Sequence, residues 1–179
     1  MSELSHLRRQ KDEVFASSAH SPLTVEQKIG FRGLDYFPEN PGLVIEVDLD
    51  TSVDPEQVLL PTSTGALRAY RRAGLVRFEL EGHPVELTLF AEELQGDLFL
   101  PFRDATSGEE SYPGGRYLEV GAPRGGRVVI DFNHAYNPYC AYAEGWSCPL
   151  PPPENWVDVP IRAGEKKFAG AVLRPAAEE

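Results

Sequence analysis

The chain has 179 residues and a formal net charge of −11, from 28 acidic and 17 basic side chains. This negative field repels a phosphate backbone, so nucleic-acid binding is not expected without a strong local basic patch. Hydrophobic residues make up 41% of the sequence and charged residues 25%, which is typical of a folded globular protein rather than a disordered one.

Residues 1–20 are charged and lack the apolar core of a secretory signal. No window approaches the roughly 18 apolar residues of a membrane span, so we expect a cytoplasmic protein that contacts no membrane. A helix is predicted over residues 2–18, with one apolar stripe and a charged remainder that includes Arg8 and Lys11. The stripe consists of Leu4, Leu7, Val14 and Phe15. A second short helix is predicted from Thr24, because Gln27 completes a capping box.

From residue 43 the apolar residues recur with a period of two, which predicts strands. These are a half-buried strand at 43–49, a hairpin at 76–80 and 85–89, and strands at 98–102, 117–120, 128–132, 157–161 and 168–173. We expect the strands at 117–120 and 128–132 to pair. Short strands between turns, in a chain with 16 prolines and 16 glycines, predict a mostly β fold, an antiparallel β-barrel or β-sandwich with an N-terminal helix. The expected organisation is an N-terminal helix over 1–20, a single all-β domain over 21–174 and a frayed tail over 175–179.

The sequence lacks the common catalytic and cofactor motifs. It has no phosphate-binding glycine loop, no Gly-x-Ser-x-Gly, no His-Glu-x-x-His and no Cys-x-x-Cys. No cofactor is therefore implied by a motif. Whether the chain is an enzyme, and its oligomeric state, stay open.

Polar and aromatic residues are densest between Asp131 and Asn155. Alternation places Asp131 and Asn133 together on the strand face opposite the apolar residues, where they would line a polar pocket. The same pocket would include the residues that follow, His134, Tyr136 and Asn137. The alternative is a set of turn residues, since Asn-Pro starts turns and Asp and Asn hydrogen-bond to nearby backbone.

A second polar segment covers residues 101–117. The residues that would meet the Asp131 strand across a hairpin are Asp104, Thr106, Tyr112 and Arg116. The Arg116 guanidinium would bind a carboxylate or phosphate through two parallel hydrogen bonds. An internal Arg–Asp pair that braces the long loop is an equally good interpretation.

The two cysteines, Cys140 and Cys148, are eight residues apart, and His134 precedes them. Buried free thiols are the first interpretation, because free cysteine is among the most buried residue types. A disulfide that closes the short loop is the second. A zinc site that uses both thiolates, His134 and one carboxylate is the third. It ranks last because paired ligands of structural zinc are usually two to four residues apart, not eight.

These residues carry a family resemblance. The chain resembles the bacterial and archaeal family called domain of unknown function 1684, which supplies no activity, substrate or catalytic residue. The matching segments are 21–23, 36–38, 101–108, 115–118, 131–140, 148–152, 154–155 and 163–166. The resemblance singles out a polar cluster as a site or as an obligatory buried network. The cluster consists of Arg116, Asp131, Asn133, Tyr136, Asn137 and Glu154. His134 stands where arginine is common in the family, which argues against an essential base or metal ligand there.

Three functional hypotheses follow. The first is an all-β domain that binds a small polar ligand, oriented by Arg116 and Asn133. Its apolar walls would be the rings of Tyr136, Tyr139 and Trp146. The second is a hydrolase that uses Asp131 or Glu154 as general base, with a metal held by the cysteines as an option. The third is a protein-interaction module that presents the proline run at 149–153, although a rigid connector fits that run better.

Overall fold

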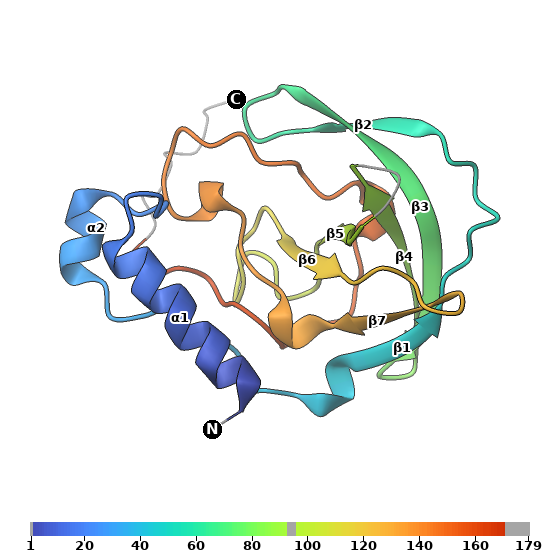
Figure 1. The fold of residues 1–179 in the computed structure, drawn as a ribbon, viewed down its shortest axis with the longest axis horizontal. Helices are drawn as coiled ribbons and strands as arrows, with labels where there is room; N and C mark the ends of the chain where they lie inside the picture. Colours follow the sequence, from blue (N-terminus) through green and yellow to red (C-terminus); the bar gives the residue numbers. More distant parts are fainter. Residues whose placement is uncertain (1, 93–95, 171–179) are drawn as a thin grey trace.

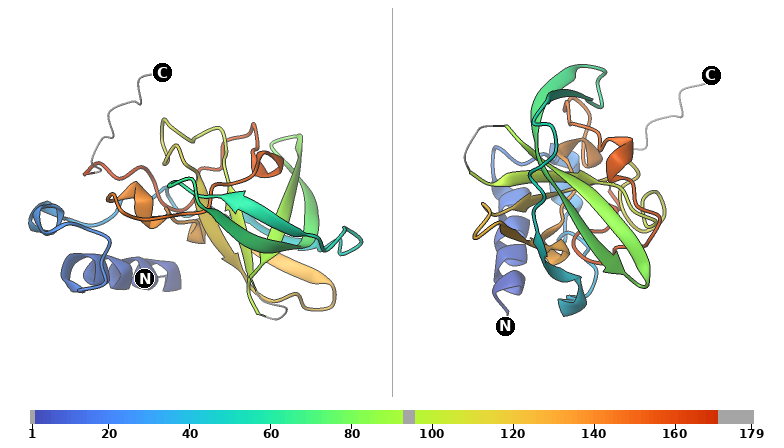
Figure 2. Two further views of the ribbon diagram at one scale, coloured as in Figure 1. Left: turned by 90° about the horizontal axis from the view of Figure 1, so that it is seen from above. Right: turned by 90° about the vertical axis from the view of Figure 1, so that its right-hand side faces the viewer.

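The computed structural model describes residues 2–92 and 96–170. Two α-helices, α1 (Glu3–Ser17) and α2 (Val25–Gly30), lie at one end of the molecule, and the longest strands lie at the other (Figure 1). Figure 2 shows the same separation from above. Among the described residues, no helix is long and apolar enough to cross a membrane.

The strands form two antiparallel sheets. Within the described residues they are β1 (Val44–Asp48), β2 (Gln57–Pro61), β3 (Leu67–Leu80), β4 (His83–Ala91), β5 (Leu98–Phe102), β6 (Arg116–Val120) and β7 (Arg127–Asp131). One sheet has the order β2-β3-β4-β5-β6, and the other pairs β1 with β7. The two sheets do not join into a closed barrel in the described part of the chain, so the mostly β architecture is sandwich-like, with an N-terminal helix.

Side chains from both sheets form the main hydrophobic core. Val76, Leu87 and Leu100 of the large sheet are fully buried against Ile130 of β7. Burial of such aliphatic side chains is the main favourable contribution to folding. The other side of the large sheet carries a smaller hydrophobic cluster of Leu60, Tyr70 and Phe90.

Four short 3-10 turns punctuate the irregular segments. They are η1 (Pro41–Leu43), η2 (Phe132–His134), η3 (Tyr139–Ala141) and η4 (Pro153–Asn155). Several predicted elements are confirmed with shifts of one or two residues. The helix at 2–18 is α1, the capping box of Thr24 and Gln27 opens α2, and the predicted hairpin is part of β3 and β4.

The predicted buried stripe of α1 is wrong in part. Leu4 and Phe15 are buried, but Leu7 and Val14 are exposed. The inward stripe continues instead through Arg8 and Lys11, at helical spacing from Leu4 and Phe15. Arg8 donates to the carbonyl of Asn133, and Lys11 forms an ion pair with buried Glu165. Two cations that the pattern assigned to solvent therefore hold the helix in place.

The predicted pairing of the strands at 117–120 and 128–132 is also wrong. β6 pairs with β5, and β7 pairs with β1, with Ile130 opposite Ile45. Residues 121–126 loop out before β7 begins, and Arg124 bridges to Arg127 within that turn. Alternation shows which residues face the core, but it does not encode which strand lies alongside, and neighbours in sequence pair only about two-thirds of the time.

The strand predicted at 157–161 is wrong: in the described chain these residues are irregular. Its backbone groups bind other partners: the Val157 amide donates to the carbonyl of Arg103, and the Ile161 amide donates to the Asp104 carboxylate. Of the last predicted strand, residues 168–170 are irregular, whereas 171–173 and the predicted tail at 175–179 lie outside the described residues.

One buried side chain bridges a gap in the large sheet. β4 and β5 are in register only at Phe90 and Phe99, so the strands separate on either side of that pair. Asn155 fills the gap from η4: its carbonyl accepts from the Thr88 amide at 2.8 Å, and its amide donates to the carbonyls of Thr88 and Pro101 at 2.9 and 2.8 Å. All the polar atoms of this side chain are therefore used to join two strands.

We expect Asn155→Ala to lower the free energy of unfolding by about 2–4 kcal/mol, because it leaves three buried backbone groups without their partners. Urea denaturation followed by circular dichroism measures the loss. The matched control is Glu154→Gln at the neighbouring residue, which removes an exposed ion pair with Arg72 and is expected to cost less than about 1 kcal/mol. Equal costs for the two variants would contradict the bridging role.

Candidate functional site

Four aromatic rings lie in a row on the side of the large sheet that faces away from the main core. They come from Tyr70 of β3, Phe99 of β5, Tyr117 of β6 and Tyr136, which follows η2. The ring centroids of Tyr70 and Phe99 are 5.4 Å apart with nearly parallel planes, those of Phe99 and Tyr117 are 4.9 Å apart, and those of Tyr117 and Tyr136 are 5.9 Å apart. The last two pairs are edge-to-face, a favourable arrangement for aromatic side chains.

Strand alternation places charged residues on the same side as these rings. Arg68 lies two positions before Tyr70 on β3, and Glu119 lies two positions after Tyr117 on β6. Asp97 lies two positions before Phe99, one residue ahead of the start of β5. Glu119 also lies directly opposite Phe99 in the β5–β6 register. The rings therefore form a floor, and charged side chains form part of its rim.

Together these residues line a hollow of about 410 Å³, which we call the ring pocket. Glu92 completes the charged rim, and Pro149 and Leu98 add apolar wall. The rim thus holds three carboxylates and one guanidinium. The volume lies within the range of about 300–1,000 Å³ found for small-molecule sites.

Tyr136 is held beside β6 by a short antiparallel bridge. The Tyr117 amide donates to the Tyr136 carbonyl at 2.8 Å, and the Tyr136 amide donates back at 2.9 Å. The Tyr136 hydroxyl donates to the Glu119 carboxylate, and the Tyr117 hydroxyl donates to the Pro149 carbonyl. Burial raises the pKa of both hydroxyls well above the ordinary value, and Glu119 raises that of Tyr136 further. Both phenols therefore stay neutral near pH 7.

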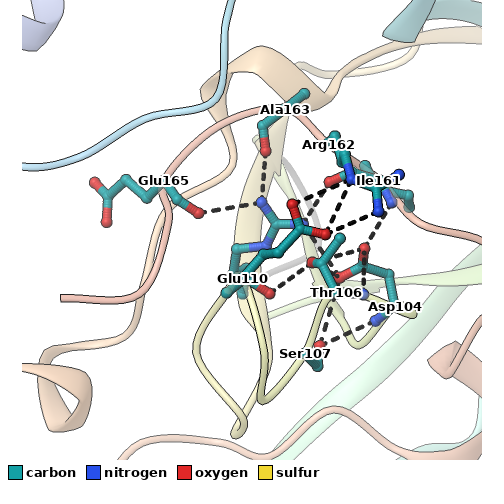
Figure 3. Close-up of polar contacts among 10 residues, drawn as sticks. Asp104, Thr106, Ser107, Glu110, Ile161, Arg162, Ala163 and Glu165 are labelled. Carbon is teal, nitrogen blue, oxygen red and sulfur yellow. Dashed lines mark hydrogen bonds and ion pairs between the residues drawn. The ribbon is translucent and has the colours of Figure 1, made fainter. Parts of the chain in front are cut away.

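Arg116, a predicted ligand-binding residue, is wholly buried. Its guanidinium forms an ion pair with Asp104 at 3.2 Å and donates to the carbonyls of Ile161, Ala163 and Glu165. The same Asp104 carboxylate accepts the Thr106 hydroxyl and the Ile161 amide (Figure 3). The guanidinium contacts are internal, as the alternative interpretation of an internal Arg–Asp pair expected. Desolvation lowers the pKa of Arg116, and Asp104 counteracts that shift.

Glu165, which was not among the predicted site residues, is the centre of a second buried network. Its side chain is 2% exposed and accepts from the Lys11 ammonium, the Tyr142 hydroxyl and the Asn137 amide at 2.9 Å. The Asn137 side-chain amide donates to the Lys166 carbonyl. The signal in the sequence was the match of residues 163–166 to the family pattern, because charge alone makes a glutamate look exposed.

Asp131 ends β7, whereas Asn133 and His134 lie in η2, so the prediction that Asp131 and Asn133 share one strand face is wrong. The Asp131 carboxylate caps the turn by accepting the Asn133 amide at 3.0 Å, and it lies 3.5 Å from the His134 ring. The Asn133 side chain binds both backbone groups of Asn40. The turn-residue interpretation describes these contacts.

No disulfide joins Cys140 and Cys148, and Cys148 is buried as the first interpretation expected, whereas Cys140 is half-buried. The Cys140 amide donates to the Cys148 sulfur at 3.4 Å, and the Tyr112 hydroxyl lies 3.6 Å from the Cys140 sulfur. A hydrogen bond between the thiols, with burial, raises the pKa of Cys148 above its ordinary value. In the described residues no three His, Cys, Asp or Glu side chains are grouped as metal ligands, and His134 lies beside Asp131 instead.

Asn133, His134 and Tyr136 line one small hollow of about 110 Å³ beside α1, and the other predicted site residues divide among separate places. Tyr136 also lines the ring pocket, Arg116 and Asp104 form the internal pair, and Asn137 belongs to the Glu165 network. Glu154 forms an ion pair with Arg72 at the surface, at 3.0 Å. The pocket residues that sequence reasoning missed are those of the floor and rim: Arg68, Tyr70, Glu92, Asp97, Phe99, Tyr117 and Glu119.

Comparison with known proteins gives a consistent result. Residues 29–166 match the model of the family described as "Protein of unknown function (DUF1684)". The chain is also similar to the solution NMR structure of the uncharacterized protein from gene locus rrnAC0354 of Haloarcula marismortui, with 38% sequence identity and a TM-score of 0.72. The match covers 92% of each chain. The search of curated proteins found no match.

We expect Arg116→Met and Asp104→Asn each to lower the free energy of unfolding by about 3–5 kcal/mol, because each leaves a buried charge without its partner. The double variant is expected to cost less than the two single changes together, since the second change removes the charge that the first one strands. Urea denaturation of the four proteins measures this coupling. The control is Arg162→Gln, which breaks a neighbouring exposed pair with Glu110 and should cost less than about 1 kcal/mol. Additive costs would show that the pair is not coupled.

Four tyrosines are also expected to ionise only when the protein unfolds: Tyr36, Tyr117, Tyr136 and Tyr142. Burial raises the pKa of each hydroxyl above the ordinary phenol value of 10.0. The protonated phenol therefore favours the folded state, so stability is retained below about pH 10 and lost as the pH rises above it. Ultraviolet titration of phenolate absorbance, with the urea-unfolded chain as reference, tests this. Ionisation of all seven tyrosines near pH 10 in the folded protein would contradict it.

Proposed function

This chain belongs to the family described as "Protein of unknown function (DUF1684)", and because that description assigns no activity, we propose a function from the structure: the protein binds a small ligand in the ring pocket. The observation that carries the proposal is the convergence of four aromatic rings and four charged side chains on one hollow of about 410 Å³. Concave sites with apolar walls and a few polar groups are where proteins bind small molecules.

The position of the rings also supports the proposal. Tyr70, Phe99 and Tyr117 stand on three strands of one sheet, and two hydrogen bonds tie Tyr136 to the same sheet. A binding surface built on strands loses little side-chain freedom when a ligand arrives, which favours affinity. The proposal keeps Tyr136 as a wall of the site. It transfers the orienting role from Arg116 and Asn133, which are buried and hydrogen-bond to internal carbonyls, to Glu119 and the other rim residues.

The hydrolase hypothesis remains the alternative, but no contact in the described residues favours it. The Asp131 carboxylate caps η2 and lies beside His134, and the Glu154 carboxylate is engaged by Arg72. For the interaction-module hypothesis, the proline run lies partly inside: Pro149 and Pro151 are buried, and Pro149 lines the ring pocket. That arrangement supports the connector interpretation of the run.

The test is a fragment screen by protein-observed NMR on the ¹⁵N-labelled chain. We expect hits to shift the amide resonances of Phe99, Tyr117, Glu119 and Tyr136. For the best hit, Tyr136→Ala is expected to weaken affinity roughly tenfold, because truncation removes one of the four rings that form the floor of the pocket. Tyr139→Ala, at an exposed tyrosine outside the pocket, should leave affinity unchanged.

Two outcomes would reject the proposal. One is a screen in which shifts of these pocket amides never occur. The other is a hit whose affinity responds equally to Tyr136→Ala and Tyr139→Ala. A denaturation curve for each variant shows that the comparison is made between folded proteins.

A further inference from the structure

We propose that the ligand class of the ring pocket is a compact organic cation, a quaternary or primary ammonium, recognised by ring faces below and carboxylates at the rim. The inference rests on the proposed function, since it takes the ring pocket as the ligand site. It goes further by naming the charge and chemical class of what binds there.

The rings supply the first part of the argument. Each aromatic face carries negative potential, and a cation within about 6 Å of a ring centre is attracted to it. The planes of Phe99 and Tyr117 differ by 75°, and those of Tyr117 and Tyr136 differ by 89°. These edge-to-face contacts occupy part of the ring faces, and Tyr70 and Tyr117 are only 3% and 7% exposed. The ring surface open to a cation therefore comes mainly from the half-buried Phe99 and Tyr136.

The rim supplies the second part. Glu92, Asp97 and Glu119 are exposed carboxylates, and Arg68 is the guanidinium that accompanies them in the described lining of the pocket. Arg68 and Glu92 both lie close enough to Tyr70 to influence the pKa of its hydroxyl, although burial is the larger cause of the shift. One guanidinium against three carboxylates leaves the described rim negative.

The whole protein and the pocket have charge of the same sign. A formal net charge of −11 favours the approach of cations over anions at long range. An anionic ligand would meet the three carboxylates of the rim as well as Arg68. A neutral ligand would fill the apolar part of the pocket but make no use of the rim. The combination of rings and carboxylates thus discriminates in favour of positive charge.

The probe is choline, and its control is 3,3-dimethyl-1-butanol, which has the same shape with carbon in place of the charged nitrogen. Binding of each is measured by amide shift titration on the wild-type chain. We expect choline to shift the pocket amides and to bind at least about threefold more tightly than the neutral isostere. Because the rim is exposed, choline affinity should fall as salt is raised to physiological ionic strength.

Three variants locate the effect. Glu119→Gln removes charge at an exposed position and is expected to weaken choline binding at least about threefold, with little change for the isostere. Arg68→Gln makes the rim more negative and should strengthen choline binding. Glu109→Gln, an exposed glutamate outside the pocket, is the matched control and should change neither ligand.

The outcomes separate the two proposals. If choline and its isostere bind in the pocket equally well, or if Glu119→Gln and Arg68→Gln have no effect, the cation inference is wrong but the pocket remains a ligand site. If choline fails to shift the pocket amides while neutral or anionic fragments do, the cation inference is again wrong alone. If choline and every fragment fail to shift them, both proposals are wrong.

Discussion

The buried guanidinium of Arg116 is the contact on which the rest of the structure depends. The segment at 156–166 forms no regular strand, so its carbonyls need partners other than a neighbouring ladder. Arg116 donates to three of them, those of Ile161, Ala163 and Glu165. Asp104 balances the charge and accepts the amide of Ile161, so one ion pair holds an irregular segment inside the protein. A lysine offers a point charge and fewer donors and would not replace this planar fork.

This internal network and the ring pocket take neighbouring residues from the same two backbone segments. Arg116 and Tyr117 are neighbours on β6, so alternation sends one side chain to the network and the other to the pocket. Tyr136 and Asn137 repeat the arrangement, because the Tyr136 ring lines the pocket while the Asn137 side chain donates to the carbonyl of Lys166, next to Glu165. Gly164 allows the two segments to touch: its φ is +75°, and a Cβ there would lie 2.4 Å from the carbonyl oxygen of Ala135. The buried network thus positions two rings of the pocket floor, those of Tyr117 and Tyr136.

Much of the fold was predictable from local pattern. Period-two alternation identified β1, β4 and β7, and the capping box identified the start of α2. β2 was missed, because its apolar run of Val58 to Leu60 is short, lies between prolines and exposes Leu59 at the sheet edge. The strand expected at 157–161 has the right alternation, but its amides bind the Arg103 carbonyl and the Asp104 carboxylate instead of a regular neighbouring strand. The internal Arg–Asp pair and the η2 cluster were foreseen as alternatives. The ring pocket was not, because its residues come from strands that are distant in sequence.

The sequence by itself determined the mostly β class, the positions of most strands, the N-terminal helix and the residues able to form buried polar contacts. Hydrophobic periodicity and capping are local, so they are readable along the chain. Only the tertiary structure decided that β6 lies beside β5, that Lys11 meets Glu165 across the molecule, and that Phe99, Tyr117 and Tyr136 share one hollow. Strand partnership depends on how whole faces pack, and a charged residue is buried only when a partner from elsewhere in the chain arrives to compensate it.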